Sequence, residues 1–100
     1  MILIEENIEE LRNLCKKYKV LRLYVFGSIL TNLFNEKSDI DFLVDFDKVR
    51  LYDYADNFFD FKYSLEELFQ REIDLLESKA IKNPFLENAI NRNKQLIYGQ

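Results

Sequence analysis

One stretch of the sequence decides the fold: Val25-Phe26-Gly27-Ser28, a spacer of ten residues, and then Asp39-Ile40-Asp41-Phe42-Leu43-Val44-Asp45. The apolar runs on both sides of the spacer have the length and composition of β-strands, over Leu21–Phe26 and Asp39–Phe46. If the glycine turn and the first acids of the second run meet at one place, the first strand ends where the second begins. The two strands are therefore expected to pair antiparallel.

Asp39 and Asp41 stand where strands rarely carry acids. Strand side chains alternate between faces, so both acids point to one side while Ile40, Phe42 and Val44 point to the other and can fill a core. Two like charges so close together repel one another, and a hard divalent cation, which takes oxygen ligands, would relieve the repulsion. The pair therefore predicts a metal site.

Gly27-Ser28 is the second half of the pattern. Glycine permits a sharp turn and the close approach of a ligand. Serine is a favourable N-cap, so Ser28 is expected to begin a short helix and to leave backbone N–H groups free for an anion. Each half is common by itself, but the two together at a strand end and a strand start predict a site for a metal-bound polyphosphate.

The combination resembles the signature of the DNA polymerase beta-like nucleotidyltransferases, Gly-Ser followed after a spacer by Asp-x-Asp, at Gly27, Ser28, Asp39 and Asp41. The spacer and the size of the chain are similar to those of the minimal nucleotidyltransferases, which are commonly paired with HEPN-type proteins in toxin–antitoxin modules. The resemblance covers nearly the whole chain. It implies an α/β (α+β) domain with the polymerase beta-like nucleotidyltransferase fold: a small mixed or antiparallel sheet of three to four strands with helices packed on it.

The resemblance also implies roles for individual residues. Asp39, Asp41 and Asp74 would bind magnesium, with two ions expected, and Gly27 and Ser28 would hold the triphosphate of ATP. Asp74 follows the longest predicted helix, where the family places its third acid; it would bind the metal at the acceptor hydroxyl and help to deprotonate it. The implied reaction is transfer of AMP from ATP to a hydroxyl, that of a tyrosine, on a cognate HEPN toxin, with this chain as the antitoxin.

One departure from the family concerns the phosphates. Many relatives carry a basic residue just after Gly-Ser, where this chain has Ile29-Leu30-Thr31-Asn32. The triphosphate charge must then be met by metal, by backbone N–H groups, or by Lys37, Arg22 or Arg71. For Asp74 the alternative interpretation is a structural acid paired with Arg71 or a lysine.

The remaining elements follow from periodicity. Helices are predicted over 5–18, within 29–34 and over 51–70; a turn over 35–38; a third strand over 71–77; a helix that starts at Asn83-Pro84; and a last strand over 95–98. The inner face of the longest helix is predicted to consist of Leu51, Tyr54, Ala55, Phe58, Phe61, Leu65, Leu68 and Phe69, and that of the last helix of Phe85, Leu86, Ala89 and Ile90. Asp45 and Asp47 are interpreted as residues of an exit loop.

Composition narrows the class of protein. A chain of 100 residues suggests a single domain, 1–100, and a net charge of −4 argues against a general nucleic-acid binder. Its one cysteine, Cys15, cannot form an internal disulfide and suits a reducing cytoplasm, and the lack of histidine excludes histidine catalysis and histidine-bound zinc. The apolar start is too short and too acidic for a signal peptide, and no segment has the length of a membrane span.

Two other functions stay open at this point. The aromatic residues outside the inner face of helix 51–70, which are Tyr52, Phe59 and Tyr63, could form a surface through which a non-catalytic antitoxin masks its partner. A small-molecule nucleotidyltransferase that acts as a homodimer is the third possibility. The sequence does not identify the nucleotide base, the acceptor atom, the number of groups transferred or the oligomeric state.

Overall fold

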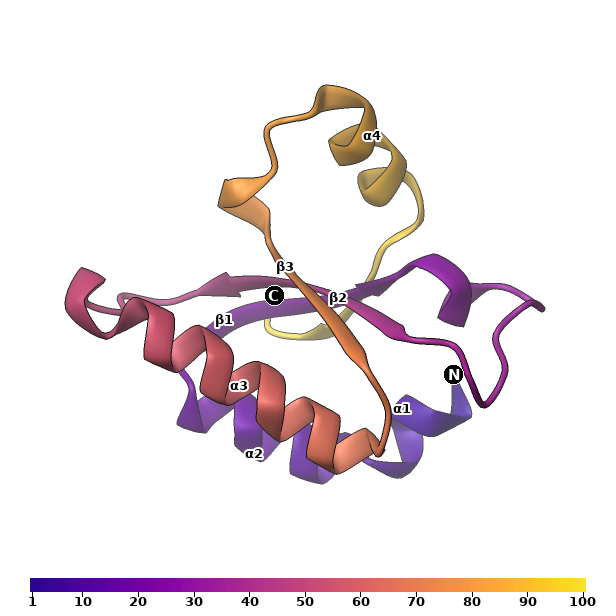
Figure 1. Ribbon diagram of the computed structural model, residues 1–100, viewed down its shortest axis with the longest axis horizontal. Helices are drawn as coiled ribbons and strands as arrows, with labels where there is room; N and C mark the ends of the chain where they lie inside the picture. Colours follow the sequence, from indigo (N-terminus) through magenta and orange to yellow (C-terminus); the bar gives the residue numbers. More distant parts are fainter.

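A four-stranded sheet in the order β3-β2-β1-β4 organises the computed structural model, which describes residues 1–100 (Figure 1). The elements in chain order are α1 (Ile2–Glu6), α2 (Ile8–Lys17), β1 (Val20–Phe26), the 3-10 helix η1 (Gly27–Leu30), β2 (Ile40–Phe46), the 3-10 helix η2 (Leu51–Asp53), α3 (Tyr54–Phe69), β3 (Ile73–Glu77), the 3-10 helix η3 (Ser78–Ala80), α4 (Pro84–Asn93) and β4 (Gln95–Tyr98).

The sheet is mixed. Strand β1 pairs antiparallel with both β2 and β4, and β2 pairs parallel with β3. The predicted antiparallel pairing of the first two strands is therefore confirmed, and so are the third strand and the short last strand. The parallel pair follows from the long crossover through α3, since a parallel neighbour cannot be reached by a tight turn.

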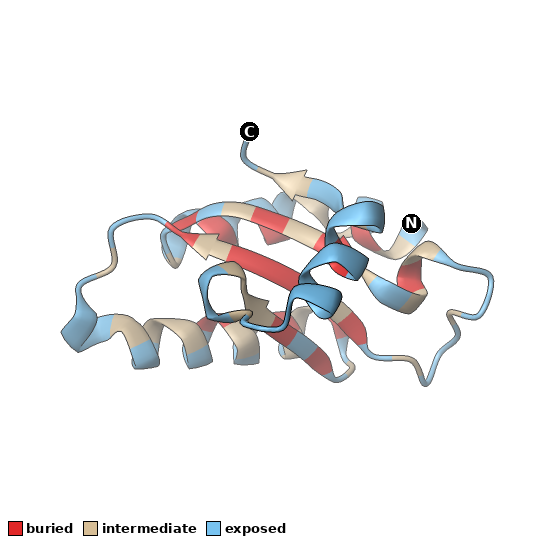
Figure 2. Ribbon diagram, turned by 90° about the horizontal axis from the view of Figure 1, so that it is seen from above, coloured by how far each residue is buried: buried red, intermediate tan, exposed pale blue.

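Helices cover the two faces of the sheet unequally. The α1, α2 and α3 helices pack on one face, whereas α4 and η3 lie over the other (Figure 1). Buried residues lie along the strands and the sheet-facing sides of α2 and α3, while α4 is almost wholly exposed (Figure 2). The core consists of Ile4, Leu11, Cys15, Val20, Leu23, Val25, Ile29, Ile40, Phe42, Val44, Phe46, Phe61, Leu65, Phe69, Ile73 and Leu75.

The first predicted helix is divided in two at Asn7. The Asn7 side-chain amide donates a hydrogen bond to the carbonyl oxygen of Leu3, and its backbone N–H donates to Ile4, so the first helix closes there. Asparagine competes for backbone groups in this way and favours helix ends. The predicted helix continues after the break, and its Leu11 and Cys15 are buried against the sheet. Burial raises the pKa of the Cys15 thiol to about 12, as expected of a structural cysteine.

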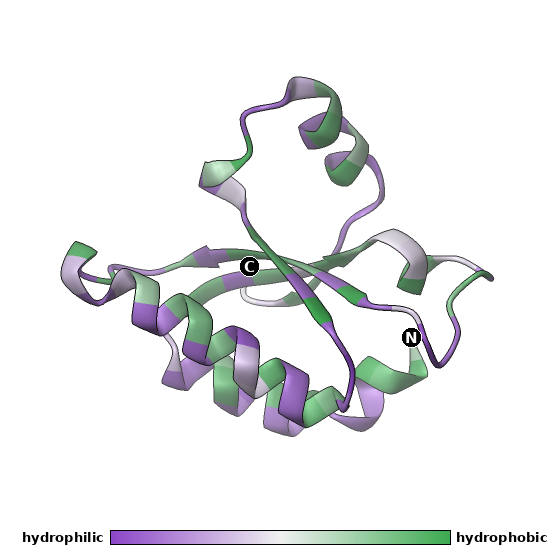
Figure 3. Ribbon diagram, in the orientation of Figure 1, coloured by the Kyte–Doolittle hydropathy of each residue, from purple (hydrophilic) through white to green (hydrophobic).

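The predicted inner face of the third helix is right in its middle and wrong at its start. Phe61, Leu65 and Phe69 are buried, but the chain opens as a 3-10 turn, which leaves Leu51 93% exposed; Ala55 is exposed as well. Hydrophobic and hydrophilic residues alternate along the ribbons of α2 and α3 in Figure 3, as expected of amphipathic helices. A 3-10 turn has three residues per turn, so it rotates its side chains away from the stripe that a continuous α-helix would form.

Two further predictions need correction. In the spacer the helix predicted within 29–34 already ends at Leu30, and Leu33 is exposed. The predicted turn over 35–38 does form, since the Ser38 N–H donates a hydrogen bond to the carbonyl of Asn35. In the last helix the Asn83 cap is confirmed, since its side-chain oxygen accepts from the N–H groups of Phe85 and Leu86. Of the four residues predicted to form its inner face, only Ile90 is buried. No helix of the chain is long and apolar enough to cross a membrane.

A pair of leucine substitutions tests the packing of α3. Leu65→Ala is expected to lower the free energy of unfolding by about 2–5 kcal/mol, because it leaves a cavity in the core. Leu51→Ala removes the same atoms from an exposed position and is expected to change that free energy by less than about 0.5 kcal/mol. Urea denaturation followed by circular dichroism measures both; equal losses would contradict the packing described here.

Candidate active site

Sheet register brings two of the predicted acids together. Asp41 stands opposite Phe26 in the antiparallel pair and beside Asp74 in the parallel pair. Because side chains at paired positions share a face, Asp41 and Asp74 both point away from α2 and α3. Asp39 is exposed and directly precedes β2, and its charge acts on Asp41. The three acids therefore lie at one corner of the sheet.

The electrostatics of the corner reflect this closeness. The pKa of the Asp41 carboxyl is raised from its ordinary 3.8 to about 6, mainly by burial and then by the negative charges of Asp74 and Asp39. Asp74 forms no ion pair with Arg71 or any lysine, so the alternative interpretation of Asp74 as a structural partner finds no support. The corner is a cluster of unneutralised negative charge.

Only glycine fits at position 27, because the backbone there lies against Asp41. The φ of Gly27 is +76°, a conformation that other residues rarely adopt, and a Cβ at this position would collide with Oδ2 of Asp41. The glycine turn and the acid pair predicted from sequence are thus in direct contact in the structure. Only a residue without a side chain lets the end of β1 come this close to Asp41.

The residues after Gly27 differ from expectation. Ser28 is not an N-cap: η1 begins at Gly27, and the carbonyl of Ser28 accepts hydrogen bonds from the N–H and the hydroxyl of Thr31. Ile29, at the position where many relatives carry a basic residue, is buried in the core. An apolar side chain at this position therefore belongs to the hydrophobic core and cannot contact the phosphates.

Two candidate arginines are engaged elsewhere. Arg22 Nε lies 3.3 Å from Oδ2 of Asp45, which stands inside β2 opposite Arg22, so the interpretation of Asp45 as an exit-loop residue is wrong. Arg71 Nη1 donates to the carbonyls of Asn35 and Ser38 at 3.1 and 2.8 Å, and its guanidinium lies 4.7 Å from the centre of the Phe34 ring. Lys37 is exposed.

The carboxylates of Asp39, Asp41 and Asp74 are suitable ligands for a hard cation. All three side chains offer carboxylate oxygens, the ligands that Mg²⁺ takes, and their mutual repulsion at Asp41 is what a cation would relieve. The carboxylates are not already closed around a central point, because no group of three or more Asp, Glu, Cys or His side chains has the spacing of a metal site. A metal would have to draw the exposed Asp39 and Asp74 side chains inward.

Comparison with known families identifies the domain. The family described as "Nucleotidyltransferase domain" matches residues 8–97. The chain belongs to this nucleotidyltransferase family. A Methanocaldococcus jannaschii protein, provisionally named a protein adenylyltransferase, is 41% identical over 83 residues, which are 83% of this chain and 80% of the relative.

Solved structures place this nucleotidyltransferase among the small members of the family. A structure provisionally described as a minimal nucleotidyltransferase superposes with a TM-score of 0.75 at 26% identity and covers 92% of this chain and 90% of that one. A complex of a tri-AMPylated Shewanella oneidensis HEPN toxin with an MNT antitoxin matches with a TM-score of 0.66 at 17% identity, over 96% of this chain and 72% of that one. The second likeness concerns the fold alone.

Sequence analysis missed Phe26 as a neighbour of the site. It is the last residue of β1, and the register sets it opposite Asp41. The sequence contained an indication of this, because strand alternation places Phe26 on the face opposite the core residue Val25. It could be used only once the antiparallel register was known.

Replacing Asp41 tests the charge cluster of this nucleotidyltransferase. The folded chain holds the Asp41 proton more tightly than the unfolded chain, so its charge costs stability above about pH 6 and costs nothing below about pH 4. Asp41→Asn is therefore expected to raise the free energy of unfolding at about pH 8 by about 1–2 kcal/mol, after allowance for solvent screening, and to leave it unchanged at about pH 3.5.

Urea denaturation in EDTA at the two pH values measures the effect. The control is Asp47→Asn, an exposed acid beyond the end of β2. A gain of the same size in the control would assign the effect to net charge instead of the cluster.

Proposed function

We propose that this nucleotidyltransferase transfers AMP from ATP to the hydroxyl of a tyrosine on a HEPN-type toxin, with Mg²⁺, and acts as the antitoxin of that pair in the cytoplasm. The observation that carries the proposal is the corner where Asp41 and Asp74 lie side by side on one face of the sheet, with Asp39 just before β2 and Gly27 against Asp41. The name of the M. jannaschii relative and the AMPylated complex of the S. oneidensis proteins support the choice of a protein acceptor.

In the proposed reaction the acceptor oxygen forms a bond to the α-phosphorus of ATP. The bond between that phosphorus and the oxygen that bridges to the β-phosphate breaks, and pyrophosphate leaves. Asp39, Asp41 and Asp74 would hold Mg²⁺, which when bound offsets the charge of the phosphates and positions them. Asp74, the exposed acid on β3, accepts the proton of the acceptor hydroxyl.

The triphosphate is assigned to Gly27 and Ser28. Ile29 is buried and Arg22 and Arg71 are engaged elsewhere, so no side-chain cation stands directly after Gly27-Ser28; the next one along the chain is the exposed Lys37. The backbone N–H groups of the turn, together with the metal, are then the groups that meet the phosphate charge. Affinity for the nucleotide should accordingly depend strongly on the metal.

Transfer of labelled AMP tests the proposal. The chain, [α-³²P]ATP, Mg²⁺ and the product of the neighbouring gene, as the candidate toxin, are incubated, and label on that product is measured after electrophoresis. The wild type is expected to label the toxin, and EDTA or the double change Asp39→Asn/Asp41→Asn to reduce the rate by at least about 100-fold, because electrostatic stabilisation of the phosphates is lost.

The control for the double variant is Asp47→Asn/Asp60→Asn, which removes the same charge from exposed positions away from the corner and is expected to keep the rate within about twofold. Undiminished transfer by the Asp39/Asp41 variant would refute the assignment of these acids. Label on a small hydroxyl compound in the absence of toxin would favour a small-molecule transferase.

One observation favours a second candidate, an antitoxin that masks its partner by binding. Phe59 and Tyr63 project from α3 at 47% and 59% exposure, with their rings stacked at 6.3 Å between centres. Tyr52, in η2 before the helix, is exposed as well. Clustered exposed aromatic side chains are typical of protein-binding surfaces. Masking through this surface would not require the acids at the corner.

Phe59→Glu separates the two candidates. The substitution adds charge to the aromatic surface at an exposed position, so the fold should persist while a masking complex weakens by at least about tenfold. The matched control is Phe85→Glu, at an exposed position on the other side of the sheet. Binding to the toxin is measured by surface plasmon resonance without nucleotide; masking is excluded if Phe59→Glu binds as tightly as the wild type.

A further inference from the structure

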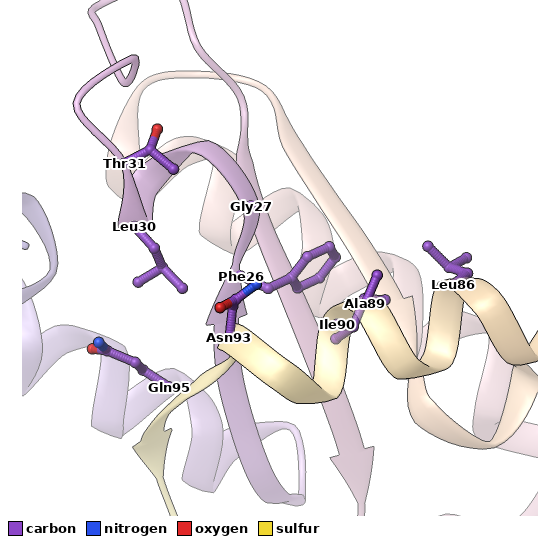
Figure 4. A pocket seen from close by; sticks show the side chains of 9 residues that line it. All are labelled: Phe26, Gly27, Leu30, Thr31, Leu86, Ala89, Ile90, Asn93 and Gln95. Atoms are coloured by element: carbon purple, nitrogen blue, oxygen red, sulfur yellow. The ribbon is translucent and has the colours of Figure 1, made fainter.

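A pocket of about 550 Å³ lies beside the glycine turn, between η1 and α4 (Figure 4). Its apolar walls come from Phe26, Leu30 and Ala89, among others, and its polar groups include the amides of Asn93 and Gln95. No charged side chain lines it. An uncharged, mostly apolar hollow with a few amides suits a neutral, flat, heteroaromatic group better than a phosphate.

The pocket accounts for the exposed apolar side of α4. Leu86 and Ala89 are exposed although helix periodicity predicts that they face inward, and both line this hollow together with the buried Ile90. The helix is therefore turned toward the sheet as its sequence predicts, but a space separates it from η1. Apolar side chains that line a space are available to a ligand.

We propose that this pocket binds the base of the nucleotide, and that the amides of Asn93 and Gln95 select adenine; this inference rests on the proposed function. Gly27 is the link, because it lines the pocket and is in contact with Asp41. A nucleotide with its base between Phe26 and α4 then has its phosphates at the turn, next to the acids. The register that sets Phe26 opposite Asp41 joins the two parts of the site.

The choice of adenine follows from the lining. A side-chain amide can donate to N7 and accept from N6 of adenine, whereas guanine is most often recognised at O6 and N7 by arginine or lysine. The pocket contains two amides and neither arginine nor lysine. The base is thus held by apolar contact with the walls and distinguished by the amides.

Filling the pocket tests the proposal. Ala89→Phe places a ring in the hollow from an exposed helix position, and Asn88→Phe, also exposed on α4 but outside the lining, is the matched control. NMR titrations of the ¹⁵N-labelled chain use two probes with Mg²⁺: AMP-PNP, and inorganic tripolyphosphate, which lacks base and ribose. Ala89→Phe is expected to weaken AMP-PNP by at least about tenfold and tripolyphosphate by less than about twofold.

The two probes distinguish failure of the proposed function from failure of the base-binding pocket. If the wild type binds neither probe, the proposed function fails, and the base site fails with it. If the wild type binds tripolyphosphate but AMP-PNP no more tightly, or if Ala89→Phe weakens both probes equally, the base pocket alone is refuted. If Ala89→Phe keeps AMP-PNP affinity and loses only transfer to the toxin, the pocket takes the acceptor and the inference is overturned.

Selectivity is tested with Asn93→Ala. The ratio of affinities for AMP-PNP over GMP-PNP is expected to fall by about tenfold, whereas affinity for tripolyphosphate stays unchanged. Asn91→Ala, an exposed asparagine on the same helix outside this pocket, is the control. An unchanged ratio in Asn93→Ala would show that this amide does not read the base.

Discussion

The alternation of side chains along β2 is the constraint on which the rest of the structure depends. Ile40, Phe42 and Val44 point into the core and are fully buried, while Asp41 and Asp45 point to the opposite face. A strand displaced by one residue would bury the acids and expose the core. The core residues thus hold the acids at the surface, and the position of Asp41 is specified by the packing of its neighbours.

The strands on the two sides of β2 bring further site residues to Asp41. The antiparallel β1 brings Phe26 and the glycine turn to Asp41, and the parallel β3 brings Asp74 to the same position from the other side. Arg71, two residues before β3, donates hydrogen bonds to the carbonyls of Asn35 and Ser38, just before Asp39. Arg71, which the sequence suggested as a ligand of the triphosphate, instead holds the segment 35–38 in place. It thereby helps to place Asp39 beside the other two acids.

Much of this arrangement was predictable from sequence, because it depends on local patterns. Strand alternation and the glycine turn were enough to predict the antiparallel pair, and the resemblance to the family implied the fold. The partner of Asp45 was not predictable, because it depends on the register with Arg22. The helix break at Asn7 and the 3-10 turn at Leu51 depend on competition for backbone hydrogen bonds, to which hydrophobic periodicity is insensitive.

The last helix shows why periodicity cannot distinguish a packed face from a binding face. The sequence of α4 has an apolar side, and the same pattern arises whether that side meets protein or lines a hollow. Here only Ile90 is buried against the sheet, the helix start is closed by the Asn83 cap, and Lys94 at its end lies 4.3 Å from the centre of the Tyr24 ring. These contacts hold α4 at its ends and at one core position. The core on the other face does not depend on the exposed residues of α4, so Leu86, Ala89 and Asn93 in the pocket lining can change without loss of the fold. Gly27 and Asp41 cannot change independently of each other, because a Cβ at position 27 would collide with Asp41.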